Sequence, residues 1–168
     1  MRRLFVTAVV AVGLLAPPVG AEESGTPCSF EVDVTLSPGL SREPSSGTFD
    51  SAGESGTVDC QGTVGGQPVT GPGTFGAVGR YGTDGDGDDC RSRRGTGDGT
   101  IHVTVPVEGG TEHVDDPFTM TYRVSGRTVV GEITGERFSG TFDVSRVDGD
   151  CLRTPIRKIR LRGTGLLS

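Results

Sequence analysis

The sequence predicts an all-β domain, an antiparallel β-barrel or sandwich of about eight to nine short strands with two disulfides. Apolar and polar residues alternate in several segments, as they do in half-buried strands. After residue 21, no window shows the apolar spacing of a helix. Leu, Ile, Val and Phe make up 31 of the 147 residues after residue 21, close to the fraction of about 20% below which chains tend to be disordered. A core this thin excludes a helical bundle or a doubly wound sheet.

Residues 1–21 have the organisation of a secretory signal. A charged start at Arg2-Arg3 is followed by an apolar centre at 4–15 and a small-residue cleavage site at 19–21. We therefore expect a secreted, extracellular protein with no membrane insertion after removal of the signal helix. Its length favours a single all-β domain over residues 22–168.

Export determines how the four cysteines are interpreted. In an oxidising compartment four cysteines usually form two disulfides. The sequence contains no Cys-x-x-Cys pair, the spacing that would suggest a metal site. Three connectivities are possible, of which we favour Cys28 with Cys60 and Cys90 with Cys151. Each bridge adds roughly 3 to 4 kcal/mol by restricting the unfolded chain, which would support the thin core.

The clearest strand lies at residues 28–36, where one face is apolar (Phe30, Val32, Val34, Leu36) and the other polar (Glu31, Asp33, Thr35). The same alternation predicts strands at 57–61, 101–107, 118–124 and 137–144, with shorter candidates at 48–51, 74–80, 128–134 and 156–162. Residues 108–117 are expected to form a connection. Glycines within the strands indicate sharp coiling or close backbone approach, as barrels require.

Turn pairs separate these segments, as expected of an antiparallel meander: Asp98-Gly99, Gly109-Gly110, Ser125-Gly126 and Asp148-Gly149. The charges of the two terminal strands suggest that the sheet closes. Opposite charges on neighbouring strands attract, so the basic last strand (Arg157, Lys158, Arg160, Arg162) is expected to pair with the acidic face of the first (Glu31, Asp33).

The net charge argues against a nucleic-acid partner. The chain has 16 basic and 22 acidic side chains, and loss of Arg2 and Arg3 with the signal leaves 14 − 22 = −8. Nucleic-acid binding normally needs a basic face, so we expect no nucleic-acid partner.

An acidic loop is the candidate cation site. Asp84, Asp86 and Asp88 alternate with glycine, and several carboxylates in one loop can bind Ca²⁺. The positions expected for glycine and the bidentate glutamate of a calcium-binding helix-loop-helix hold Asp89 and Gly95 instead. A solvated acidic loop is therefore the simpler interpretation, and no other cofactor is expected.

No catalytic residue is predicted. The motifs G-x-S-x-G and H-E-x-x-H do not occur. His102 lies on the outward face of its strand, and His113, in the expected connection, has Asp115 nearby as a conceivable proton-transfer partner. Histidines in loops are more often simply exposed, so we expect a protein that is not an enzyme.

A succession of short motifs carries a resemblance: residues 71–76 (GPGTFG), 80–82 (RYG), 116–122 (DPFTMTY), 139–142 (SGTF) and 149–151 (GDC). It resembles a group of small exported Gly/Thr-rich β-domain proteins of Gram-positive bacteria with no assigned activity. The resemblance implies a secreted β-domain with two disulfides and carries over no catalytic residue. The chain is also distantly similar to barrels of the allene oxide cyclase and dirigent type, although residues 94–99 (RGTGDG) replace their Gly-Gly-Thr-Gly-x-Tyr run.

Our leading expectation is a non-enzymatic secreted module that contacts an envelope polymer, a protein partner or a small ligand. In the alternative, the barrel binds or isomerises a small apolar molecule in an interior lined by aromatic residues (Phe30, Phe49, Phe75, Phe118, Tyr122, Phe138, Phe142). A cavity of several hundred Å³ reached by a polar group would favour that alternative. A third possibility is a protease inhibitor that presents residues 89–95 beside Cys90.

Overall fold

A computed structural model describes residues 25–51, 56–90, 94–125, 128–151 and 153–168. The expected signal at 1–21 lies outside these residues. Every regular element in the described part is a β-strand, which confirms the all-β fold. The same residues include no helix long and apolar enough to cross a membrane.

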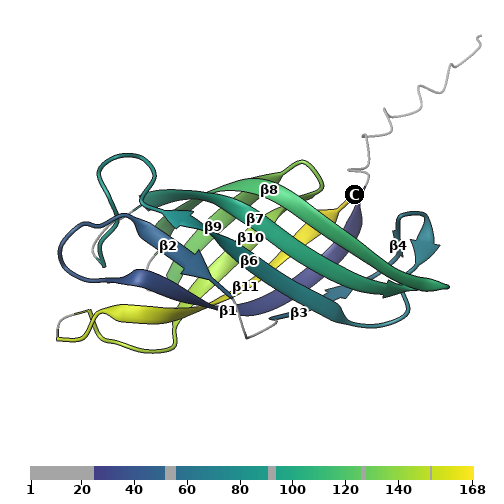
Figure 1. Cartoon of the computed structure of the whole chain (residues 1–168), viewed down its shortest axis with the longest axis horizontal. Coiled ribbons are helices and arrows are strands. Elements are labelled where there is room, and N and C mark those ends of the chain that lie inside the picture. Colours follow the sequence, from purple (N-terminus) through teal and green to yellow (C-terminus); the bar gives the residue numbers. More distant parts are fainter. Residues whose placement is uncertain (1–24, 52–55, 91–93, 126–127, 152) are drawn as a thin grey trace, which may run out of the picture.

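Most of the predicted strands are longer in the structure than the sequence predicted, whereas Gly47–Asp50 and Gly56–Cys60 have the predicted length. They are β1 (Thr26–Leu40), β2 (Gly47–Asp50), β3 (Gly56–Cys60), β4 (Thr63–Val64), β5 (Gln67–Pro68), β6 (Gly73–Tyr81), β7 (Arg94–Val107), β8 (Gly110–Ser125), β9 (Thr128–Gly135), β10 (Phe138–Arg146) and β11 (Ile156–Leu167). β4 and β5 form a small separate hairpin, seen at the right of Figure 1.

The other nine strands form one antiparallel sheet that closes into a barrel (Figure 1). β6 to β11 follow one another as a meander, and β11 returns to pair with β1. β2 and β3 share the position between β1 and β6, because each pairs with a different stretch of both neighbours. Nine strands therefore occupy eight positions. Closure decides between barrel and sandwich in favour of the barrel.

The seam between β1 and β11 carries the charge complementarity that the sequence predicted. Glu31 lies opposite Arg162, and Asp33 lies opposite Arg160. Arg160 forms a two-point pair, with Nε 2.6 Å from Asp33 Oδ1 and Nη2 3.0 Å from Oδ2. Arg162 Nε lies 2.6 Å from Glu31 Oε2. These contacts cover the outside of the strand pair that closes the barrel.

Two predictions about β7 and β8 were wrong. Asp98-Gly99 is no turn, because β7 runs through it with partners in β6 and β8 on either side. Residues 108–117 are no connection either: the chain turns at Glu108 and Gly109, and β8 begins at Gly110. Gly109 has φ 87°, a value suited to glycine in a tight hairpin turn. Continuous pairing of β7 with β8, from Arg94 opposite Arg123 to Val107 opposite Gly110, outweighed the turn tendency of Asp98-Gly99.

Both disulfides have the favoured connectivity, Cys28–Cys60 and Cys90–Cys151. Cys28 and Cys60 lie directly opposite each other on β1 and β3. The other bridge joins the β6–β7 and β10–β11 connections, among the loops at the left of Figure 1. The two covalent links therefore hold opposite ends of the barrel.

The barrel end near Cys28–Cys60 is filled by aromatic side chains, and we call it the packed half. Phe30 stacks on Phe75 at 4.5 Å between ring centroids, and Phe138 meets both rings edge-on at 5.7 Å. The rings of Phe30 and Phe138 lie over Gly163 and Gly165 of β11, where a Cβ would come within 2.7 and 2.6 Å of them. These glycines let the rings fill the interior.

Candidate functional site

The end of the barrel near Cys90–Cys151, which we call the open half, contains a cavity of about 650 Å³. Its wall is mainly aliphatic and aromatic and comes from strands all round the barrel. The lining residues are Val34, Leu36, Leu40, Phe49, Phe75, Ala77, Tyr81, Asp89, Cys90, Ile101, Phe118, Met120, Tyr122, Thr128, Val129, Ile133, Phe142, Val144, Ser145, Arg146, Cys151, Ile156, Ile159 and Leu161. Among them Thr128, Ser145 and Arg146 are exposed and mark the rim.

The buried side chains of β7 differ between the two halves of the barrel. In the packed half the buried positions of this strand hold Val103, Val105 and Val107, and Ile101 before them borders the cavity. In the open half the corresponding buried positions are Gly95 and Gly97. A Cβ at Gly97 would lie 2.4 Å from Met120 Cε on β8, so the Met120 side chain lies against bare backbone there.

Most of the aromatic residues predicted to line the interior lie on the cavity wall. Phe75, Phe118, Tyr122 and Phe142 do so, together with Phe49. Phe30 and Phe138 do not, because they form the filled cluster of the packed half. Phe75 belongs to both: it stacks on Phe30 and forms the floor of the cavity.

A buried carboxyl group lies behind one part of the wall. Asp88 is only 1% exposed, and its Oδ2 accepts a hydrogen bond from the hydroxyl of Tyr122. Among the residues the structure describes, its Oδ1 has no hydrogen-bond partner. Burial raises the pKa of Asp88, and the bond from Tyr122 opposes that rise. Burial also raises the pKa of Tyr122 far above its usual value, and the contact with Asp88 adds to the effect.

Tyr81 supplies a second hydroxyl to the same region. Its side chain is buried and donates a hydrogen bond to the backbone carbonyl of Pro38. Burial raises the pKa of Tyr81 as well. Both tyrosine hydroxyls at the wall therefore point their protons at protein acceptors.

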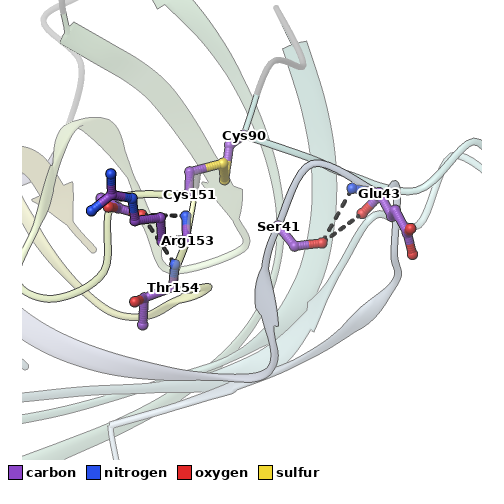
Figure 2. Close-up of a disulfide and its surroundings, with 7 residues drawn as sticks. Ser41, Glu43, Cys90, Cys151, Arg153 and Thr154 are labelled. Carbon is purple, nitrogen blue, oxygen red and sulfur yellow. Dashed lines mark hydrogen bonds between the residues drawn. A yellow bond between two sulfur atoms is a disulfide. The ribbon is translucent and has the colours of Figure 1, made fainter.

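The chain segments around the mouth are tied together. Ser45 and Asp88 exchange two backbone hydrogen bonds of 2.8 and 2.9 Å, and Cys90 N–H donates to the Ser41 carbonyl at 2.9 Å. Figure 2 shows Ser41 and its Glu43 partner on a segment beside the Cys90–Cys151 disulfide. These bonds hold the β6–β7 connection against the β1–β2 connection, which positions Asp88 facing inward.

The β10–β11 connection, at the same end of the barrel, contains a turn held by the carboxylate of Asp150. Asp150 Oδ1 accepts hydrogen bonds from the backbone N–H groups of Arg153 at 2.8 Å and Thr154 at 3.0 Å, the two residues labelled below Cys151 in Figure 2. The β10–β11 connection that carries Cys151 is thus supported on both sides of that cysteine.

The structure does not bring the predicted calcium ligands together. Asp84 and Asp86 are exposed, whereas Asp88 turns into the barrel toward Tyr122. In the described part of the chain, no three or more His, Cys, Asp or Glu side chains converge to hold a metal ion. The backbone bridge between Asp88 and Ser45, rather than loop composition, turns Asp88 inward.

The histidines lie on the outer face of the β7–β8 hairpin. Asp115 pairs with His102 at 2.7 Å, rather than with His113 as conceived from the sequence. His113 Nδ1 instead lies 3.1 Å from Thr104 Oγ1. The register explains both contacts, because His102 lies opposite Asp115 and Thr104 opposite His113. These groups are exposed and lie apart from the cavity.

The loop expected of a protease inhibitor, residues 89–95, falls partly outside the described residues, at 91–93. Its final residues, Arg94 and Gly95, already belong to β7. Sequence reasoning missed Tyr81 and Asp88 as parts of the interior. Tyr81 follows Phe75, Ala77 and Gly79 in strict alternation, which was a usable signal.

Comparison with known proteins yields no relative: no protein-family model, curated protein or solved structure matches this chain. Arguments about function therefore rest on the cavity and its wall.

Proposed function

We propose that this protein is a secreted binding protein that holds a small apolar molecule in the open half of its barrel. The observation that carries the proposal is the cavity of about 650 Å³ with its largely apolar wall. Ligand sites for small molecules usually span about 300–1,000 Å³ and combine apolar walls with a few polar groups. Here the polar groups away from the rim include Tyr81 and Tyr122, with Asp88 behind them, and Thr128, Ser145 and Arg146 lie at the rim.

The outer surface offers less support for binding through surface contact. Among the described residues, Val78 and Val147 are the large hydrophobic residues that are clearly exposed. They lie on different elements, β6 and the β10–β11 connection. Extended apolar patches are the usual mark of a docking surface, so the interior is the better candidate for recognition.

Secretion is part of the proposal. Two disulfides are compatible with an oxidising compartment outside the cell, and residues 1–21 have the pattern of a signal. Binding is proposed rather than isomerisation, because the hydroxyls of Tyr81 and Tyr122 already donate to protein acceptors. Neither proton is therefore positioned for transfer to a ligand.

The test combines identification of the ligand with a block of the cavity. Native mass spectrometry of the protein from its own culture medium should show a bound small molecule, and the purified protein should bind the neutral apolar probe N-phenylnaphthylamine. Val144→Trp adds a large ring to the cavity wall and should weaken probe binding at least about tenfold. Thr134→Trp adds the same ring to the exposed face of β9 and should leave binding unchanged. Equal probe binding by the two variants would reject the cavity as the site.

A further inference from the structure

Away from the exposed rim, where Thr128, Ser145 and Arg146 can donate, the polar part of the cavity wall presents an acceptor rather than a donor. Tyr122 lines the cavity and is half-buried, whereas Asp88 lies behind it. The Tyr122 hydroxyl has one proton, and it donates that proton to Asp88 Oδ2. With that proton committed to Asp88, the phenolic oxygen can act toward a ligand only as an acceptor.

A second observation points the same way. Asp88 Oδ1 is buried and, among the described residues, has no partner. A Cβ at Gly95, a buried position of β7, would lie 2.3 Å from this atom and 2.4 Å from the Tyr122 hydroxyl oxygen. Asp88 Oδ1 and the Tyr122 hydroxyl oxygen thus both lie against Gly95, where no side chain separates them from the backbone, and both are acceptors. The neighbouring hydroxyl of Tyr81 also donates away, to the Pro38 carbonyl.

The charges nearby restrict the polar group further. Asp84 and Asp89 lie on the same connection as Asp88, and their negative charges disfavour ionisation of Asp88. An anionic group brought to Tyr122 would meet the same repulsion. Arg146 lies at the exposed rim, at the end of β10 and beyond Phe142 and Val144 along that strand.

We propose that the ligand is an apolar molecule that ends in a neutral hydroxyl, and that this hydroxyl donates a hydrogen bond to the oxygen of Tyr122. Its hydrocarbon part would then lie against Phe118 and Phe142, which share the cavity wall with Tyr122. This inference rests on the proposed function and adds the chemical class of the ligand.

The same geometry explains why related molecules would bind less well. An ether or a ketone has no proton to offer, so it would need the proton of Tyr122. Taking that proton would break the bond to Asp88 and leave a buried carboxylate without its donor, which is costly. A carboxylate has the same disadvantage and adds repulsion from Asp88.

The experiment compares n-decanol, its methyl ether and decanoate as competitors of N-phenylnaphthylamine on the full chain at neutral pH. The alcohol should bind about fivefold more tightly than the ether, which corresponds to one neutral hydrogen bond, and decanoate should bind most weakly. Equal affinities for alcohol and ether would overturn the inference and leave the proposed function intact. Tighter binding of decanoate would also overturn it, because Arg146 at the rim would then be the anchor. Failure of all three to bind would overturn both.

Variants assign the preference to the tyrosine. Tyr122→Phe removes the acceptor and should bring the alcohol-to-ether ratio close to one, with little change for the ether. Because that change leaves Asp88 without its donor, the double variant with Asp88→Asn provides a second test free of a buried unpaired charge. Thr121→Val removes a hydroxyl from the exposed face of the same strand and should keep the fivefold ratio. A ratio that survives in both Tyr122 variants would reject the assignment.

Discussion

The two halves of this barrel are made from the same strands and differ in what fills them. In the packed half Phe30, Phe75 and Phe138 contact one another across the interior. In the open half the rings line a cavity of about 650 Å³ instead. β7 passes through both halves, with branched aliphatic residues in one and inward glycines in the other. One half therefore serves mainly stability, and the other leaves room for a ligand.

This division implies that stability and binding can be changed separately. The buried core runs through both halves, but only the packed half is filled across the interior by rings in contact, and the thin apolar composition is consistent with that.

The largest effect is expected from truncating an aromatic ring in the packed half. Phe138 is completely buried, so Phe138→Ala should lower the free energy of unfolding by about 4–5 kcal/mol through lost burial and a new cavity. Phe118→Ala should cost about 2–3 kcal/mol, because one side of that ring already borders empty space. Urea unfolding measures both. Equal costs would show that the open half is packed in solution.

The disulfides should separate stability from binding. Replacing either cystine with two serines should lower the free energy of unfolding by about 4 kcal/mol, since each bridge closes a long loop in the unfolded chain. Only the loss of Cys90–Cys151 should also weaken probe binding, because both of these cysteines line the cavity. Loss of Cys28–Cys60 should leave the dissociation constant of the folded protein unchanged. Denaturant titration with probe fluorescence reports both quantities, and equal effects on binding would contradict the division.

The comparison also shows what the sequence alone can predict. Period-two alternation identified part of each longer strand, since successive side chains of any strand face opposite sides, but it missed residues 94–100 of β7 and 110–117 of β8. The charges of Glu31, Asp33, Arg160 and Arg162 predicted the closing seam correctly. The favoured disulfide pairing is also confirmed.

The hollow half could not be predicted in the same way. Whether the interior is filled depends on which inward side chains face each other across the barrel. The register between strands that lie far apart in the sequence decides this. Asp88 shows the difficulty: its Asp-Gly surroundings predict a solvated loop, yet its carboxyl contacts Tyr122, 34 residues away. Gly95, which makes room for this contact, looked like one glycine among many.

A smaller effect is expected from the buried carboxyl of the open half. The pKa of Asp88 is raised above 3.8 by burial, so its neutral form fits the fold better than its charged form. This contribution to stability is fully present below pH 3.8, and the wild type should lose it as pH rises through the raised pKa. Asp88→Asn should lack this loss. Tyr122, Tyr81, Asp84 and Asp89 remain in both proteins, so the difference between the two pH profiles isolates Asp88. Parallel profiles would show that Asp88 is not buried as a titrating group.

The smallest effect, with the opposite sign, is expected from a carboxylate on the outer wall. The hydrogen bond from Arg160 is the main cause that lowers the pKa of Asp33 below 3.8, so the charged form is the stabilised one. This contribution is present above pH 3.8 and is lost as pH falls through the lowered pKa. Asp33→Asn should therefore cost about 0.5–1 kcal/mol at neutral pH, as partly exposed ion pairs do, and progressively less in acid. Salt should reduce the cost as well, because the pair lies at the surface. Two carboxyl groups of one barrel would then respond to pH in opposite directions, one hidden behind the cavity wall and one paired across the closing seam. Chemical unfolding gives the free energy of unfolding of each Asn variant relative to the wild type across the acid range. If this difference changed with pH in the same direction for both variants, the opposite responses of the two carboxyl groups would be rejected.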